Sequence, residues 1–133
     1  MSATHYIATA PTGGPEEVET LHAAGVWAVH ASDGVTVRDV TRADAVVLTV
    51  KGYVLTHTPS GQAASAFVDL DDAIAAADML GAAHGQWAQD APFGDMKAPY
   101  WAQYAEVIGD IRSALAAAKM VRLAARHAAK VNP

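Results

Sequence analysis

Two histidines each end a short apolar segment that precedes turn-forming residues, and they are the first candidates for chemistry. The segments read VWAVHASDG, which holds His30, and YVLTHTPSG, which holds His57. If the two segments form neighbouring hairpins, both imidazoles could bind a metal ion together or act in acid–base catalysis. The chain has no HExxH and no His-x-His spacing. We therefore keep a metal site or small enzyme at His30 and His57 as an alternative, and expect each ring to stabilise its own turn.

Other patterns that resemble functional motifs have simpler interpretations. APTGGPEE, residues 10–17, is a glycine loop before a helix-like segment, but it lacks the Lys-Ser/Thr of a phosphate-binding loop and its glutamates would repel an anion. The acids Asp69, Asp71 and Asp72 suit a helix N-terminus and lack the spacing of a calcium loop. There is no cysteine, so thiolate chemistry and disulfides are excluded. We predict no catalytic residue and no cofactor.

The elements that must position the histidines are predicted from apolar periodicity and turn residues. A strand is expected over His5–Ala10, and a helix over Pro15–Ala24 with Gly25 just past its end. Two strands, Val26–Ala31 and Val35–Val40, are expected to flank a hairpin turn at Ser32-Asp33-Gly34.

The next segments lead to two clearer helices. Residues 41–51 have both a valine-rich strand pattern and a capped helix start, so both structures stay open there. Tyr53–His57 and Gln62–Val68 are predicted to form a hairpin around the turn TPSG. Helices are then predicted over Asp69–Gln89 and over 99–131, with a linker at 91–98.

Aligning the glycines suggests an internal repeat. G25-VWAVH-ASD-G34 matches G52-YVLTH-TPS-G61 at an offset of 27 residues, and up to three strand–turn–strand–helix units would end at Gly25, Gly52 and Gly81. The repeat favours a short helix over residues 41–51, whereas a chance match in a biased composition is the competing explanation.

These elements predict one domain of the α+β class. A small, mostly antiparallel sheet in residues 1–90 is covered by helices, and a long C-terminal helix follows. The length of 133 residues and the 52% of hydrophobic residues suit a single core, and no apolar run is long enough to cross a bilayer.

The C-terminal helix carries the most informative pattern. Its first half has an apolar seam at spacings of three and four residues, made of Trp101, Tyr104, Ile108, Ile111 and Leu115. After residue 116 that side of the helix becomes basic, and the basic face comprises Arg112, Lys119, Arg122, Arg126 and Lys130. The other side there is small and apolar, with Met120, Val121, Ala124 and Ala128. We take the seam and this apolar side together as the candidate oligomer interface.

Charge is divided between the body and this helix. Residues 1–110 hold all 14 acids and four bases, a net of −10, while residues 111–133 hold five bases and no acid, a net of +5. We predict a cytoplasmic, phage- or bacterium-encoded interaction or structural protein. It self-associates through the C-terminal helix, does not bind membranes, and can pair with a partner that has an acidic surface. A DNA-associated regulator using the basic helix is the first alternative.

Overall fold

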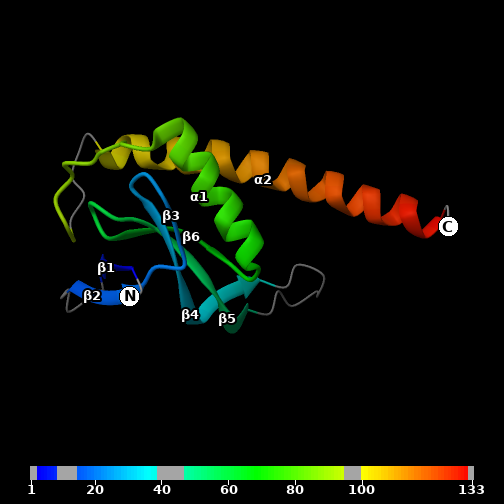
Figure 1. The fold of residues 1–133 in the computed structure, drawn as a ribbon, viewed down its shortest axis with the longest axis horizontal. Coiled ribbons are helices and arrows are strands. Elements are labelled where there is room, and N and C mark those ends of the chain that lie inside the picture. Colours follow the sequence, from blue (N-terminus) through cyan, green and yellow to red (C-terminus); the bar gives the residue numbers. More distant parts are fainter. Residues whose placement is uncertain (1–2, 9–14, 39–46, 95–99, 132–133) are drawn as a thin grey trace.

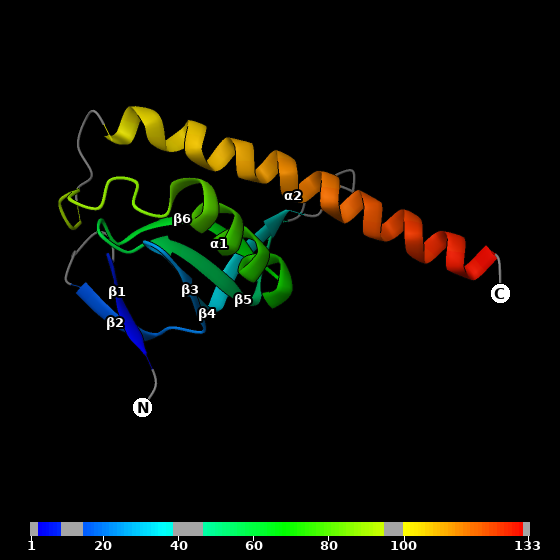
Figure 2. The ribbon, with the colours of Figure 1, turned by 45° about the horizontal axis from the view of Figure 1, so that its top comes forward.

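The molecule has three layers (Figure 1, Figure 2): two helices, a four-stranded sheet beneath them, and a two-stranded sheet on the far face of the four-stranded one. The computed structural model describes residues 3–8, 15–38, 47–94 and 100–131. In chain order the elements are β1 Thr4–Ala8, β2 Pro15–Glu19, β3 His22–Ala24, β4 Trp27–Arg38, β5 Val47–His57, β6 Gln62–Phe67, α1 Leu70–His84 and α2 Tyr100–Val131. The predicted α+β class is confirmed, and so are the antiparallel pairing and the long C-terminal helix.

The main sheet has the order β3-β4-β5-β6 and every neighbouring pair is antiparallel. Because side chains alternate along a strand, Trp27, Val29 and Leu55 share the face that the helices cover. They join small residues of α1 and apolar residues of α2 in one core, whose fully enclosed members are Trp27, Val29, Leu55, Ala73, Ala76, Ala77 and Leu80. Burial of this apolar surface holds the helices on the sheet.

The predicted hairpin at Ser32-Asp33-Gly34 is wrong. β4 runs without a break through these residues, and the register with β5 shifts between Ser32 and Val35, which is a β-bulge. Gly52 on β5 makes room for it, since a Cβ there would lie 2.5 Å from a methyl carbon of Val35 and 2.4 Å from the carbonyl oxygen of Phe67. Residues that are typical of a chain reversal therefore form a bend within one strand here.

The predicted helix over Pro15–Ala24 is also wrong. Residues 15–19 form β2, which pairs with β1 so that His5 faces Val18 and Tyr6 faces Glu17, and residues 22–24 form β3. The proline and the acids at the start of this segment favour a helix only where no neighbouring strand offers a ladder of hydrogen bonds instead. Here PEEVE alternates between the faces of a ladder, with Val18 half-buried and its neighbours exposed.

The helix favoured for residues 41–51 is wrong for its second half, since Val47–Lys51 belongs to β5, while residues 41–46 lie outside the described residues. The proposed unit ends have three different settings: Gly25 lies in the β3–β4 turn, Gly52 in the middle of β5 and Gly81 inside α1. The aligned segments also differ, because ASD continues a strand and TPS forms a turn.

The two helices begin near the predicted residues. Asp69 caps α1, its carboxylate accepting a hydrogen bond from the amide of Asp71, and the helix ends at His84 rather than Gln89. α2 begins at Tyr100 and continues to Val131, and its last turns extend beyond the body (Figure 1). In the predicted linker, residues 95–98 lie outside the described part of the chain.

Candidate functional site

His57 is fully buried and both of its ring nitrogens have partners. Nε2 lies 2.8 Å from the carbonyl oxygen of Trp87, and Nδ1 lies 2.8 Å from Oγ of Ser60 in the turn that follows. A carbonyl only accepts, so Nε2 carries the proton and Nδ1 accepts from the serine hydroxyl. Burial lowers the pKa of His57, which keeps the ring neutral. The expectation that His57 stabilises its own turn is confirmed for this residue.

The ring of His57 also packs against two tryptophans, whose own rings stack with centroids 6.2 Å apart. Its centroid lies 5.1 Å from that of Trp27 and 5.2 Å from that of Trp87. Trp27 donates from Nε1 to the carbonyl of His84 at the end of α1, 3.0 Å away. This aromatic cluster packs the β5–β6 turn against the segment after α1. It also encloses the ring of His57, so a ligand cannot reach it.

His30 and His57 do not form a joint site. Trp27 pairs directly with His57 across the β4–β5 ladder, so those two share a face. His30 lies three residues after Trp27 on a regular stretch of strand and therefore points to the opposite face. Within the described residues, no group of three or more histidine, cysteine or acidic side chains is placed to hold a metal ion.

His30 instead contacts His5 of the two-stranded sheet. The ring centroids are 5.4 Å apart with the planes at 61°, and the residues are 5% and 8% exposed. Nδ1 of His5 lies 2.6 Å from Oγ1 of Thr20. Nε2 of His5, Nδ1 of His30 and Oγ1 of Thr56 are buried without a hydrogen-bond partner. Sequence reasoning singled out His30 and missed His5, although the alternation in THYIA gave a signal that His5 shares an inward face with Ile7.

Burial keeps both histidines neutral. The pKa of His5 is lowered from 6.5 to about 4, first by burial and then by the neighbouring His30. The pKa of His30 is lowered by burial, and the carboxylate of Glu16 partly opposes that change.

The first half of α2 packs on the body of its own chain. Ile108 and Ile111 are buried in the core, and Tyr104 and Leu115 pack against it. The hydroxyl of Tyr104 donates to the carbonyl of Ala63 at 2.8 Å, so the helix also shields the edge of β6. Of the predicted seam, Trp101 is the member with a mainly exposed side chain, at 59%, and it stacks on Tyr104.

The second half of α2 presents apolar side chains to solvent. Met120 is 66% exposed, Val121 70% and Leu123 46%, and Ala124 and Ala128 are exposed as well. By helical spacing Met120, Ala124 and Ala128 follow one another along one side, with Val121 beside them. We call Met120, Val121, Ala124 and Ala128 the apolar stripe.

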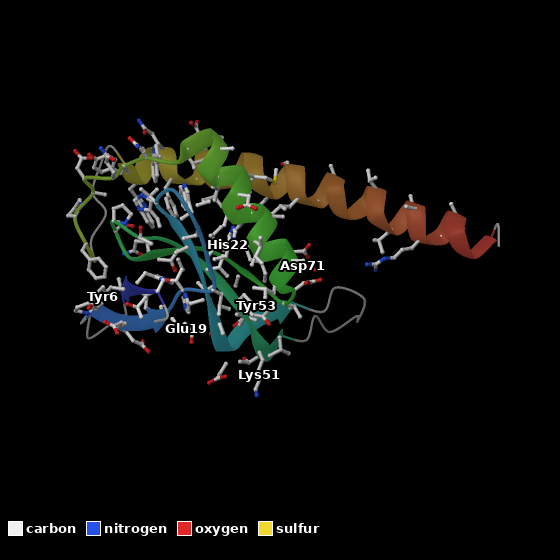
Figure 3. All side chains as sticks on the ribbon, in the orientation of Figure 1. Tyr6, Glu19, His22, Lys51, Tyr53 and Asp71 are labelled. Carbon is white, nitrogen blue, oxygen red and sulfur yellow. The ribbon has the colours of Figure 1, made fainter. Side chains whose placement is uncertain are left out.

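The basic face starts on the body and continues past it. Arg112 is exposed and its guanidinium lies 3.5 Å from the carbonyl of Ala64. Arg126 lines a cleft of about 520 Å³ between α2 and the start of α1, whose other walls include Asp69 and Asp71. Figure 3 shows Asp71 at the end of α1 that lies toward the projecting part of α2. The side chains of Lys119, Arg122 and Lys130 lie outside the described residues.

Comparison with protein-family models, with curated proteins and with solved structures finds no match to this chain. Among the described helices, neither α1 nor α2 combines the length and the apolar character that a membrane span requires.

Proposed function

We propose that this protein is a non-enzymatic interaction or structural protein that self-associates through the second half of α2. The observation that carries the proposal is the apolar stripe on a helix that extends beyond the body (Figure 1). Contiguous exposed apolar side chains on a protein surface mark sites of contact with another molecule, so the apolar stripe is best explained as a surface that a partner covers.

A second copy of the chain is the occupant that the charges favour. The segment 111–133 has a net charge of +5 and the rest of the chain −10. Two copies can therefore place the cationic helix of each near the anionic body of the other, which lowers the electrostatic free energy of association. Alanine buries little area, so the stripe alone is a small interface and charge attraction must contribute.

Truncation after Ala116 tests the proposal. It removes the apolar stripe and leaves the α2 residues of the core, Val107, Ile108 and Ile111, together with Leu115, which packs against the core. We expect a folded body by circular dichroism and a lower molar mass by light scattering. Raising the salt concentration should also lower the mass of the full chain, because screening weakens attraction between exposed charges.

A point substitution with a matched control makes the test sharper. Met120→Asp puts a carboxylate into the apolar stripe, and Ala102→Asp adds the same charge at an exposed position in the half of α2 that packs on the body. We expect Met120→Asp to reduce the mass at a given concentration and Ala102→Asp to leave it unchanged. Equal masses for the two variants would argue against the stripe as the interface.

The DNA-associated alternative has less support. Arg126 faces a cleft that Asp69 and Asp71 also line, and these carboxylates reduce its attraction for phosphate. The alternative predicts duplex binding that weakens steeply with salt and is lost on changing Arg122 and Arg126 to Glu. If that variant binds duplex as well as the natural chain does, the basic helix is not a DNA-binding element.

The cellular setting follows from composition alone. A cytoplasmic protein encoded by a bacterium or phage is our proposal from the alanine-rich, cysteine-free sequence.

A further inference from the structure

The two-stranded sheet β1–β2 covers the outer face of the main sheet at the histidine pair. His5 and Ile7 point inward from β1, and Val18 and Glu16 point inward from β2, since His5 pairs with Val18 and Ile7 with Glu16. Tyr6, Glu17 and Glu19 alternate to the outside. Figure 3 shows Tyr6 and Glu19 on this layer, away from the helices.

The layer is held by few interactions. No residue of β1 or β2 belongs to the main hydrophobic core of the described chain. One backbone hydrogen bond joins Ala8 to the carbonyl of Gly61, at 2.9 Å. A hollow of about 450 Å³ opens beside it, lined by His5, Tyr6, Pro15, Thr58 and Phe93. Among the described residues, the contact of His5 with His30 is therefore one of the interactions that attach this layer to the main sheet, beside the half-buried Ile7 and Val18.

The unpartnered atoms at this contact have a defined place. His30 pairs with Val54 and Ala28 with Thr56, so His30 and Thr56 are diagonal neighbours on the face that His5 covers. Unpartnered buried polar atoms cost free energy, and a proton added to either ring would place a charge in this buried contact. Protonating both rings would add repulsion between two cations whose centroids are 5.4 Å apart.

We propose that the His5–His30 contact is an acid-sensitive latch: in mild acid the β1–β2 layer detaches from the main sheet and exposes the face that carries Ala28, His30 and Thr56. Once the layer is detached, both rings reach water and take up protons freely. The main sheet stays folded, because its core lies on the opposite face, against α1 and α2. The latch is separate from the apolar stripe on α2.

The groups around the pair decide how the latch responds. From β2, the acid on the inward face is Glu16, whose carboxylate raises the pKa of His30. From the β2–β3 connection Thr20 contacts His5, and from β5 Thr56 lies beside His30. Removing the charge of Glu16 should lower the pKa of His30 further in the attached state, which widens the gap to its ordinary value in the detached state and moves detachment to higher pH. Removing the charge of Glu19, which lies on the outward face of β2, should leave the pH of detachment unchanged.

Residue-resolved amide hydrogen exchange of the full chain, measured at several pH values, tests the latch. Below pH 6.5 each unit of pH favours the detached state up to tenfold for each histidine that gains a proton on detachment. For His5, whose pKa falls from 6.5 to about 4, this amounts to about 300-fold over the whole interval. We expect protection factors of β1 and β2 to fall with pH while those in the paired centre of β4 and β5 stay constant.

Two variants complete the test. Glu16→Gln should shift the loss of protection to higher pH, and Glu19→Gln should leave it in place. Three results would overturn the latch: equal protection of β1–β2 at pH 7 and pH 4, loss of protection in both sheets at one pH, or equal shifts in the two variants.

Discussion

Replacing His57 by alanine tests whether this histidine is a structural residue. The side chain is 0% exposed, packs against Trp27 and Trp87, and bonds Ser60 and the carbonyl of Trp87. The change therefore leaves a cavity and removes the ring as a hydrogen-bond partner of the Trp87 carbonyl and the Ser60 hydroxyl, although the hydroxyl keeps its contacts with the backbone of His57 and Gln62.

The cost follows from these contacts. A buried group left without its hydrogen-bond partner costs about 1–3 kcal/mol, and loss of a ring from a packed site adds the cavity term. The sum is about 4 kcal/mol, a large share of the stability of a domain of this size. With a urea m-value of about 1.5 kcal/mol per molar, the unfolding midpoint should fall by more than about 2 M.

Urea unfolding followed by tryptophan fluorescence measures this cost, with His127→Ala as the control because His127 is exposed on α2. The control should change stability by less than about 0.5 kcal/mol. The double variant with Ser60→Ala should lose less than the sum of the two single changes, since one deleted bond is shared. A loss below about 1 kcal/mol for His57→Ala would refute a structural role and would direct attention back to chemistry at this ring.

Three further outcomes are expected. Gly81→Ala should destabilise the fold by about 1–3 kcal/mol, because the new Cβ would lie 2.5 Å from that of Ala24 and this clash outweighs the better helix propensity of alanine. The control Ala83→Gly, at an exposed position of α1, should cost about 1 kcal/mol by helix propensity alone, and thermal unfolding of the two variants gives the comparison. Tyr104→Phe should cost about 1 kcal/mol through the lost bond to Ala63, whereas Tyr6→Phe at an exposed bond to Glu17 should cost less, as read from urea midpoints. The contribution of His5 to the free energy of unfolding should be complete above pH 6.5 and should fall by up to about 3 kcal/mol as the pH drops toward 4, because the unfolded chain binds a proton that the folded chain excludes. A free energy of unfolding that stays constant from pH 7 to pH 4 would contradict this.

The elements that the sequence predicts well are those whose stability is local. TPSG is a turn with its own serine–histidine bond, Asp69 caps α1 through its own carboxylate, and α2 has a regular apolar spacing. In the turn and the cap, residues close in the sequence supply both the pattern and the partners, and in α2 the regular spacing alone predicts the helix.

The errors fall where distant partners decide. Residues 15–19 form a strand because β1 offers a ladder, and Ser32-Asp33-Gly34 bulges within a strand because Gly52 on β5 leaves space. The placement of His30 against His5 depends on how the two sheets stack, which no spacing within the chain encodes. Whether His30 and His57 lie on one face likewise depends on the register of β4 and β5, which residues distant in the sequence determine.

The molar mass of the full chain in solution tests the central claim most directly. The single chain has a mass of 13.8 kDa. Light scattering over a range of concentrations should give at least twice that mass at low salt, with a decrease on truncation after Ala116. A mass of one chain at every concentration up to several hundred micromolar would contradict self-association through α2.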